Sequence, residues 1–405
     1  MSASLRIFIS TGEVSGDLQG SLLVEALYRQ AQVRNIDLEV VALGGERMSQ
    51  AGARLLANTS GIGSVGLLES IPYILPTLNI QQRAQRYLQK QLPDLVVLID
   101  YVGPNLSLGQ YLHSQLPQLP IVYYIAPQAW IVPRIWGKVL RPKTTQQIVR
   151  FTDRILAIFL GEADYFRHHG ANVTWVGHPL VDRMQAAPDR EQARAALGVA
   201  ADCVAIALLP ASRQQEIANL MPAIFQAAQH LQAKIPQAHF WIPLSLERYR
   251  PAVEQAIERY GLRATLVSSQ SSTNNEFRRL CALAAADLAI TKSGTVNLEL
   301  ALLNVPQVVL YRVNPITAWL AFKVLNFSVP FMSLANLVPM KPIVPELLQT
   351  EATPKNIVQV SLELLFNPRR RQQMLADYQS MCQVLGEVGA CDRAAQEIFR
   401  FLQES

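Results

Sequence analysis

Several polar side chains that could do chemistry come directly after short apolar runs of the sequence. Asp100 ends the run DLVVLID, and Glu13 follows LRIFIS within the small-residue turn STGEVSGD. A carboxylate can act as a general base when it lies within hydrogen-bond reach of an alcohol. We therefore identify Asp100 as the leading catalytic candidate and Glu13 as the second. A helix cap or an arginine partner is the structural alternative for Asp100.

The turn that contains Glu13 is also suited to an anion. Gly12 and Gly16 let the backbone approach a ligand, and Ser15 and Asp17 can cap the helix that follows. The turn does not match the G-x-G-x-x-G fingerprint, which argues against a nicotinamide cofactor. We place Gly12 and Ser15 among the cleft or acceptor residues, with plain helix capping as the alternative for Ser15.

His178 in GHPLVD follows another apolar run and precedes the change of pattern between the two halves of the chain. Pro179 stiffens the backbone there. Histidine can hydrogen-bond a phosphate or a sugar hydroxyl, so cleft-lining, a hinge role and catalysis remain open for His178.

A second set of turns predicts a nucleotide diphosphate site. Arg213 follows CVAIALLP, and a guanidinium beside helix amides can grip a diphosphate. DLAITKSGTVNLE puts Ser293, Gly294 and Thr295 at another turn between a strand and a helix, with Glu299 positioned for sugar hydroxyls. Each turn alone could be a plain helix cap. Together they indicate a nucleotide diphosphate ligand.

The elements that position these residues alternate between short apolar runs and longer helical segments, which is typical of parallel sheets buried on both faces. We predict an α/β fold of two doubly wound Rossmann-like domains that face each other across a cleft. The predicted ranges are 1–185 for the first domain, 186–375 for the second domain, which would bind the nucleotide, and 376–405 for terminal helices that cross back to the first domain. The predicted strands are 5–10, 38–43, 94–100, 121–126, 154–159, 173–177, 203–210, 239–244, 264–269, 287–291 and 307–312.

Composition favours a globular protein, because 50% of the 405 residues are hydrophobic and 17% are charged. The four cysteines match no zinc or redox spacing, so we expect buried thiols. No signal peptide or membrane span is apparent, and membrane contact should be peripheral. The net charge of +5 includes a basic stretch that could attract anionic lipid, made of Arg134, Lys138, Arg141, Lys143, Arg150 and Arg154. Residues 64–76 and 317–331 are apolar stretches that are either core helices or lipid-contacting patches.

The motifs, in this order, resemble the lipid-A-disaccharide synthases, which are inverting glycosyltransferases with two Rossmann-like domains of the GT-B type. The resemblance covers nearly the whole chain. It rests on GEVSGD (12–17), GGERM (44–48), SVGLLE (64–69), PDLVVLID (93–100), VGHPLVD (176–182), LLPASRQQEI (208–217), SGTVNLE (293–299), LANL (334–337) and PELLQ (345–349).

This resemblance implies transfer from UDP-2,3-diacylglucosamine to 2,3-diacylglucosamine 1-phosphate, with release of UDP and formation of a β-1,6-linked disaccharide. Asp100 corresponds to the base and Glu13 lies near the reacting sugars. The matched donor-side positions are Arg213, Ser293, Gly294, Thr295, Glu299, Asn336 and Gln349. No cofactor and no metal are expected. The expected partners are a UDP-sugar, a lipid acceptor and an anionic membrane surface, with no nucleic acid, and homodimer formation is left open. The expected location is the cytoplasm, on the inner face of the cytoplasmic membrane.

Two acceptor-side motifs differ from the family pattern. The family's I-D-A-P-D-F becomes Asp100 followed by Tyr101, Val102, Gly103 and Pro104, and its S-V-W-A-W becomes PQAWIV, which keeps Trp130 as a cleft or acceptor residue. The alternatives are therefore transfer to a different lipid, an epimerase similar to UDP-GlcNAc 2-epimerase, and a non-catalytic protein that binds nucleotide sugars or lipids.

Overall fold

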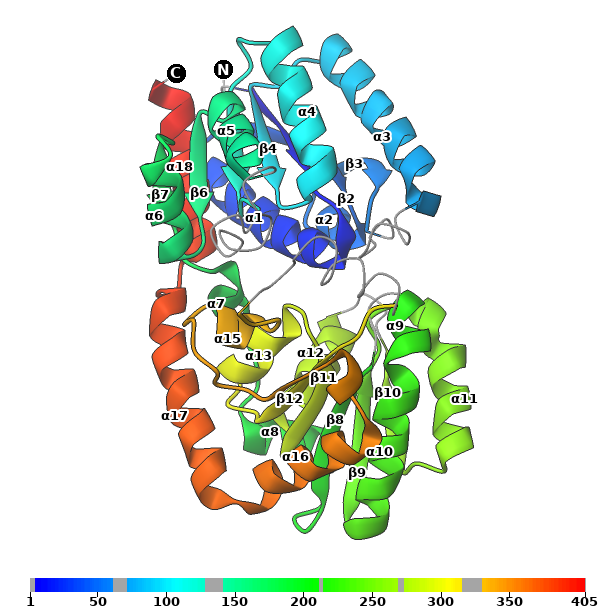
Figure 1. Cartoon of the computed structure of the whole chain (residues 1–405). Helices are drawn as coiled ribbons and strands as arrows, with labels where there is room; N and C mark the ends of the chain where they lie inside the picture. Colours follow the sequence, from blue (N-terminus) through cyan, green and yellow to red (C-terminus); the bar gives the residue numbers. More distant parts are fainter. Residues whose placement is uncertain are drawn as a thin grey trace. The chain divides into compact units, whose positions relative to one another are not determined.

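The computed structural model describes residues 4–60, 71–127, 141–210, 214–268, 273–314 and 330–404. The chain divides into two compact units (Figure 1). Within the described residues, the first unit contains 4–183 and 385–404, and the second contains 184–314 and 330–384. Each unit has one parallel sheet with helices between its strands. This confirms the prediction of two α/β units.

The first sheet has the strand order β3-β2-β1-β4-β5-β6-β7, and its recorded strand pairs are parallel. Its order reverses between β1 and β4, where ligands bind in open α/β sheets. The strands are β1 (Ser4–Ser10), β2 (Asp37–Gly44), β3 (Arg54–Asn58), β4 (Leu95–Ile99), β5 (Ile121–Tyr124), β6 (Arg154–Ala157) and β7 (Val173–Trp175). The helices of this unit are α1 (Glu13–Val33), α2 (Glu46–Gln50), α3 (Ile71–Lys90), α4 (Val102–Gln115), α5 (Arg141–Phe151), α6 (Leu160–His168), α7 (Pro179–Met184) and α18 (Ala390–Glu404).

The second sheet has the order β10-β9-β8-β11-β12-β13, again with parallel pairs. Its strands are β8 (Val204–Leu209), β9 (Ala238–Pro243), β10 (Ala264–Val267), β11 (Leu288–Lys292), β12 (Gln307–Tyr311) and β13 (Glu346–Leu348). The helices are α8 (Arg190–Leu197), α9 (Gln214–Asn219), α10 (Met221–Lys234), α11 (Arg250–Tyr260), α12 (Thr273–Ala284), α13 (Val296–Leu302), α15 (Leu334–Leu337), α16 (Pro354–Phe366) and α17 (Pro368–Leu385), with short 3-10 turns η1 (Glu247–Tyr249) and η3 (Gln349–Glu351).

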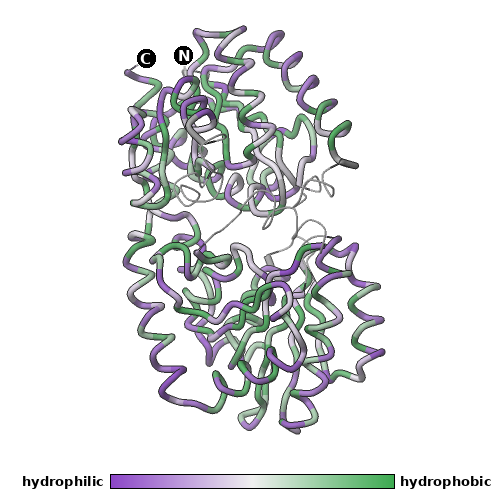
Figure 2. The backbone as a smooth tube through the Cα atoms, in the orientation of Figure 1, coloured by the Kyte–Doolittle hydropathy of each residue, from purple (hydrophilic) through white to green (hydrophobic). Residues whose placement is uncertain are grey.

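The core of each unit lies along its central strands. All five residues of β4 are buried, and so are Ile7, Phe8 and Ile9 of β1. In the second unit, Leu288, Ala289 and Ile290 of β11 are fully inaccessible. Strands covered by helices on both faces lose contact with water on both faces, which explains their continuous apolar runs. Figure 2 shows this as hydrophobic strands with hydrophilic residues on the outer helices.

The C-terminal helix α18 belongs to the first unit and packs beside α1 (Figure 1). Arg29 of α1 pairs with Asp392 at 3.1 Å. Arg154 is buried and binds Glu397 at 3.1 Å and Glu404 at 3.3 Å. Arg154 is therefore not part of an exposed basic surface, contrary to our interpretation of the basic stretch, because α18 covers it.

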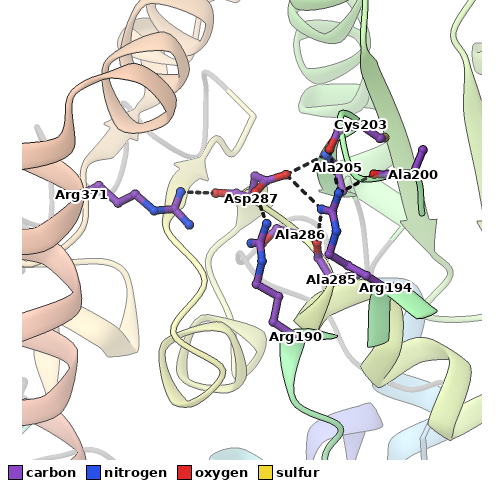
Figure 3. A network of polar contacts seen from close by, with 9 residues as sticks. All are labelled: Arg190, Arg194, Ala200, Cys203, Ala205, Ala285, Ala286, Asp287 and Arg371. Atoms are coloured by element: carbon purple, nitrogen blue, oxygen red, sulfur yellow. Dashed lines mark hydrogen bonds and ion pairs between the residues drawn. The ribbon is translucent and has the colours of Figure 1, made fainter. Parts of the chain in front are cut away.

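In the second unit, Asp287 joins the first and last helices to the amino-terminal edge of the sheet (Figure 3). Its carboxylate accepts bonds from Arg190 at 2.5 Å, Arg194 at 3.4 Å and the Ala205 amide at 2.9 Å. Its backbone oxygen accepts a bond from Arg371 of α17 at 2.8 Å. Asp287 thus attaches α8 to the sheet through its carboxylate and α17 through its backbone oxygen.

Cys281 and Cys391 are buried, but Cys203 and Cys382 are half-buried, so the expectation of four buried thiols was only half correct. The difference arises because Cys203 precedes a strand and Cys382 lies on the long outer helix α17. No helix within the described ranges combines the length and the hydropathy needed to cross a bilayer.

Candidate functional site

Asp100 lies at the carboxyl end of β4, at the edge where the order of the first sheet reverses. Its side chain is exposed, although the strand before it is buried. Asp100 and Tyr101 both have left-handed backbones, with φ of 43° and 52°. Tyr101, not Asp100, occupies the N-cap position of α4. The exposed carboxylate is thus held on a sharp bend at a sheet edge.

The start of α1 lies next to this bend. A Cβ atom on Gly12 would come within 2.6 Å of the Tyr101 ring, so only glycine fits there. Gly12 is the N-cap of α1 and makes no side-chain cap bond, and Ser15 is half-buried in the first turn. Asp17 does not cap α1. Its carboxylate accepts bonds from amides of the GGERM turn, including Gly45 at 2.7 Å, so it fixes that turn to α1.

A buried carboxylate that sequence reasoning missed joins the ends of β5 and β6. Glu162 accepts bonds from the amides of Ala126 and Ile158 at 2.9 Å and of Phe159 at 3.3 Å. Burial raises the pKa of Glu162 to about 8, although the three N–H donors oppose the increase; the charge of Asp100 adds to it. Glu162 thus fixes the residues that follow β5 and β6 to the start of α6. No sequence motif marks it.

His178 is 2% exposed. Its Nδ1 accepts a bond from the Leu180 amide at 3.1 Å, its own amide donates to the Leu385 oxygen at 2.9 Å, and its ring lies 5.2 Å from that of Phe159. Burial lowers its pKa to about 3, and the nearby Asp182 partly offsets this effect. These contacts fix the start of α7, and the choice among the alternatives for His178 stays a prediction.

The predicted donor-side turns meet at the carboxyl edge of the second sheet. Ser293 to Thr295 follow β11, as predicted, and Ser293 Oγ donates to the Met332 oxygen at 2.6 Å. The Ser293 amide donates to Leu310 and the Gly294 amide to Asn297 Oδ1. These two amides are therefore bonded within the protein and are not exposed at the turn. The turn is instead fixed to neighbouring segments.

Asn336 is the centre of a buried hydrogen-bond network. Its Nδ2 donates to the Val344 oxygen at 2.9 Å and to Glu346 at 2.8 Å, and its Oδ1 accepts from the amides of Ile343 and Val344 at 2.7 and 2.8 Å. An amide side chain has two donor hydrogens and two acceptor lone pairs, so all four are used. The Glu346 carboxylate also accepts bonds from the Ser333 amide and hydroxyl at 2.9 and 2.8 Å. Asn336 thus shapes the LANL turn from within, and sequence reasoning missed Glu346.

Glu299 of α13 is 4% exposed and pairs with Arg279 of α12 at 2.8 Å. Arg279 also binds Glu276 at 3.1 Å. Burial would lower the pKa of Arg279, but the charges and hydrogen bonds of Glu299 and Glu276 outweigh it, so its pKa is raised. Arg279 thus fixes the Glu299 carboxylate on its helix.

Gln349 follows β13 and has a left-handed backbone with φ of 47°. Its Nε2 is buried and has no hydrogen-bond partner among the described residues, whereas its backbone oxygen accepts from Arg312 at 3.1 Å. A buried donor without a partner is costly, and a ligand acceptor would relieve that cost.

Lys292 is a further residue that sequence reasoning missed. It lies half-buried beside the Ser293 turn, and its Nζ is 3.9 Å from Glu216 Oε1.

Several predicted residues lie outside the described parts of the chain. They are Arg213, Trp130, the basic residues at 134 and 138, and the apolar segments 64–70 and 317–329. Glu13 begins α1, but its side chain is not described. The structure therefore brings Gly12 and Asp100 to one edge of the first unit, and the Ser293, Asn336 and Gln349 turns to one edge of the second.

Two parallel α/β units with polar turns at the carboxyl edges of their strands define a GT-B type protein. This class includes glycosyltransferases and epimerases that act on nucleotide sugars. The family model described as lipid-A-disaccharide synthetase matches residues 7–399, and the chain belongs to this family. It is therefore a glycosyltransferase of lipid A biosynthesis, as the sequence motifs predicted.

Lipid-A-disaccharide synthases from other organisms match the chain along nearly its full length. The chain is 56% identical to the lipid-A-disaccharide synthase of Gloeothece citriformis, covering 98% of this chain and 100% of the relative. It is 53% identical to that of Synechocystis, covering 98% of each. These matches support the transferase over the epimerase and the non-catalytic alternatives.

Solved structures of low sequence identity share the fold. UDP-GlcNAc 2-epimerase from Neisseria meningitidis, bound to UDP-GlcNAc, matches with a TM-score of 0.64 at 14% identity, covering 99% of this chain and 100% of that one. The glycotransferase of kitacinnamycin matches with a TM-score of 0.58 at 14% identity, covering 98% and 99%. They support the fold alone.

Proposed function

We propose that this chain joins UDP-2,3-diacylglucosamine to 2,3-diacylglucosamine 1-phosphate and releases UDP. Asp100 takes the proton of the acceptor 6-hydroxyl as the alkoxide oxygen bonds to the anomeric carbon of the donor. The bond from that carbon to the UDP oxygen breaks at the same time, and displacement from the opposite face gives the β-1,6 linkage. The supporting observation is the match along residues 7–399, combined with an exposed carboxylate at the end of a buried strand.

In this proposal the second unit binds UDP. Ser293, Gly294 and Thr295 lie along the diphosphate, Glu299 binds sugar hydroxyls and Gln349 Nε2 donates to the nucleotide. The buried Nε2 without a protein partner supports the role of Gln349. Arg213 neutralises the charge that develops on the leaving UDP. Asn336 contributes by shaping the turn, since its side chain is fully bonded within the protein.

Acceptor selection is assigned to the first unit. Glu13 and Ser15 lie in the first turn of α1, beside the Asp100 bend. Trp130 belongs to the PQAWIV motif at 127–132. We further propose a peripheral contact with an anionic membrane on the cytoplasmic face, because the proposed donor and acceptor both carry acyl chains. Homodimer formation stays a prediction.

The test is the variant Asp100→Asn. Removing a general base costs on the order of 10²- to 10⁴-fold in rate. We expect kcat to fall by about that factor in an assay of UDP release with both lipid substrates, with product mass confirming the disaccharide. Binding of UDP, measured by calorimetry, should be unchanged, because Asp100 does not belong to the second unit. Unchanged turnover in this variant would contradict the assignment of the base.

A further inference from the structure

The bend that carries Asp100 is strained. Asp100 and Tyr101 are consecutive non-glycine residues with left-handed backbones. That conformation is unfavourable for a residue with a Cβ atom, and it persists where the surrounding structure fixes it. The contacts that fix the bend are therefore the contacts that place the carboxylate.

Asn105, in the first turns of α4, is one such contact. It is fully buried, and its Nδ2 lies 2.9 Å from the Asp100 oxygen, 3.1 Å from the Ile99 oxygen and 3.2 Å from the Ser10 oxygen. Its Oδ1 accepts the Ser10 hydroxyl at 2.7 Å. Asn105 thus joins the ends of β1 and β4 at the bend.

Tyr123 of β5 is the second contact. Its side chain is fully buried, and its hydroxyl donates to the same Asp100 oxygen at 2.9 Å. Burial, together with the charge of Asp100, raises the pKa of Tyr123, so the hydroxyl stays protonated and can donate. The Asp100 amide donates to the Ile125 oxygen at 3.0 Å. Hydrogen bonds therefore hold both peptide groups that flank the Asp100 Cα atom.

We propose that Asn105 and Tyr123 are positioning residues for the Asp100 carboxylate in the transfer reaction, an inference that rests on the proposed function. Both side chains bind the backbone of Asp100 and leave its carboxylate exposed. They fix the direction in which the base points. A structural role alone would consist of satisfying the buried carbonyl oxygens at the strand ends, and it would affect stability only.

The first test compares Tyr123→Phe with Tyr124→Phe. Both tyrosines are fully buried neighbours on β5, but the Tyr123 hydroxyl donates to Asp100, whereas the Tyr124 hydroxyl lies beside Cys391. We expect Tyr123→Phe to lower kcat about 10-fold, with the donor KM and the UDP affinity unchanged. Tyr124→Phe should leave kcat at the wild-type value. Equal kcat in the two variants would overturn the role of Tyr123.

The second test uses Asn105→Ala. Misplacing a catalytic group by about 1 Å can cost on the order of 10²-fold in rate, so we expect that loss in kcat at unchanged UDP affinity. If Asn105→Ala does not fold, Ser10→Ala removes only the hydroxyl bond to Asn105 and should lower kcat several-fold. A lowered melting temperature with wild-type kcat would show a purely structural role and overturn the proposal.

Asp100→Asn separates this inference from the proposed function. If that variant is inactive while the Asn105, Ser10 and Tyr123 variants turn over at the wild-type rate, the base stands and the positioning role is wrong. If Asp100→Asn stays active, the proposed mechanism itself is wrong.

Discussion

His178 illustrates how burial alone can give a residue a pH-dependent effect on stability. The folded state keeps the ring neutral down to a pKa of about 3, whereas the unfolded chain takes up a proton below pH about 6.5. Between these values the unfolded state binds more protons, so the free energy of unfolding decreases as the pH falls through this window. Asp182 is the charged neighbour that partly offsets this effect.

We therefore predict that His178→Asn reduces the acid sensitivity of the first unit. Asparagine Oδ1 can replace Nδ1 as the acceptor for the Leu180 amide, and it does not titrate. The measurement is the urea midpoint between pH 7 and pH 4, where the wild type should lose more stability than the variant. His230→Asn, at an exposed position of α10, is the control. An identical pH slope in His178→Asn and wild type would contradict this explanation.

Among the described helices, α3 carries a group of exposed apolar side chains that suits contact with a membrane. Ile74, Leu75 and Leu78 are 49%, 72% and 51% exposed, and Arg86 is exposed further along the helix. Leu75, Leu78 and Arg86 fall on one face at helical spacing, and no acidic residue occurs between residues 71 and 90. Apolar residues followed by cations favour an interface with anionic lipid.

We predict that the double variant Leu75→Asp, Leu78→Asp lowers binding to vesicles of phosphatidylglycerol and phosphatidylcholine by at least about 10-fold. Burying one leucine is worth roughly 1.5–3 kcal/mol, and about 1.4 kcal/mol corresponds to tenfold. Val33→Asp, at an 81% exposed position of α1, is the control. Co-sedimentation measures the binding. Wild-type binding by the double variant would exclude this face of α3 as the contact.

Strands with apolar runs could be predicted from the sequence, including the edge strands β7 and β10, whereas two other edge strands could not. The run at 94–100 predicted β4 within a residue at each end. The edge strands β3 and β13 were missed because each begins with a charged residue and has only a short apolar run, as in RLLAN and ELL.

The same limit applies to the site. The turns at Asp100 and Ser293 were identified because they follow buried strands. Asn105 and Glu162 were not, because their partners lie 95 and 36 residues away in sequence, and only folding brings these groups together. Buried polar networks leave no local pattern, since the pairing depends on the tertiary structure.

At the scale of the whole molecule, the two units separate the two halves of the proposed chemistry. The base and the residues that hold it belong to the first unit, whereas the turns assigned to UDP belong to the second. Ligand binding stabilises the part of a protein that binds it, by about 2.7 kcal/mol at 100 times Kd. The effect of UDP on each unit can therefore be measured separately.

Hydrogen exchange with and without saturating UDP provides this measurement. We predict slower exchange at the Ser293 turn, in α15 and around Gln349, and unchanged exchange in β1 and β4. Asp100→Asn should show the same protection, because its carboxylate does not bind UDP in our proposal. Gln349→Ala should weaken UDP binding by about 5-fold, since one hydrogen bond is worth about 1 kcal/mol and its donor is otherwise unpaired among the described residues. Protection confined to the first unit would contradict the assignment of UDP to the second.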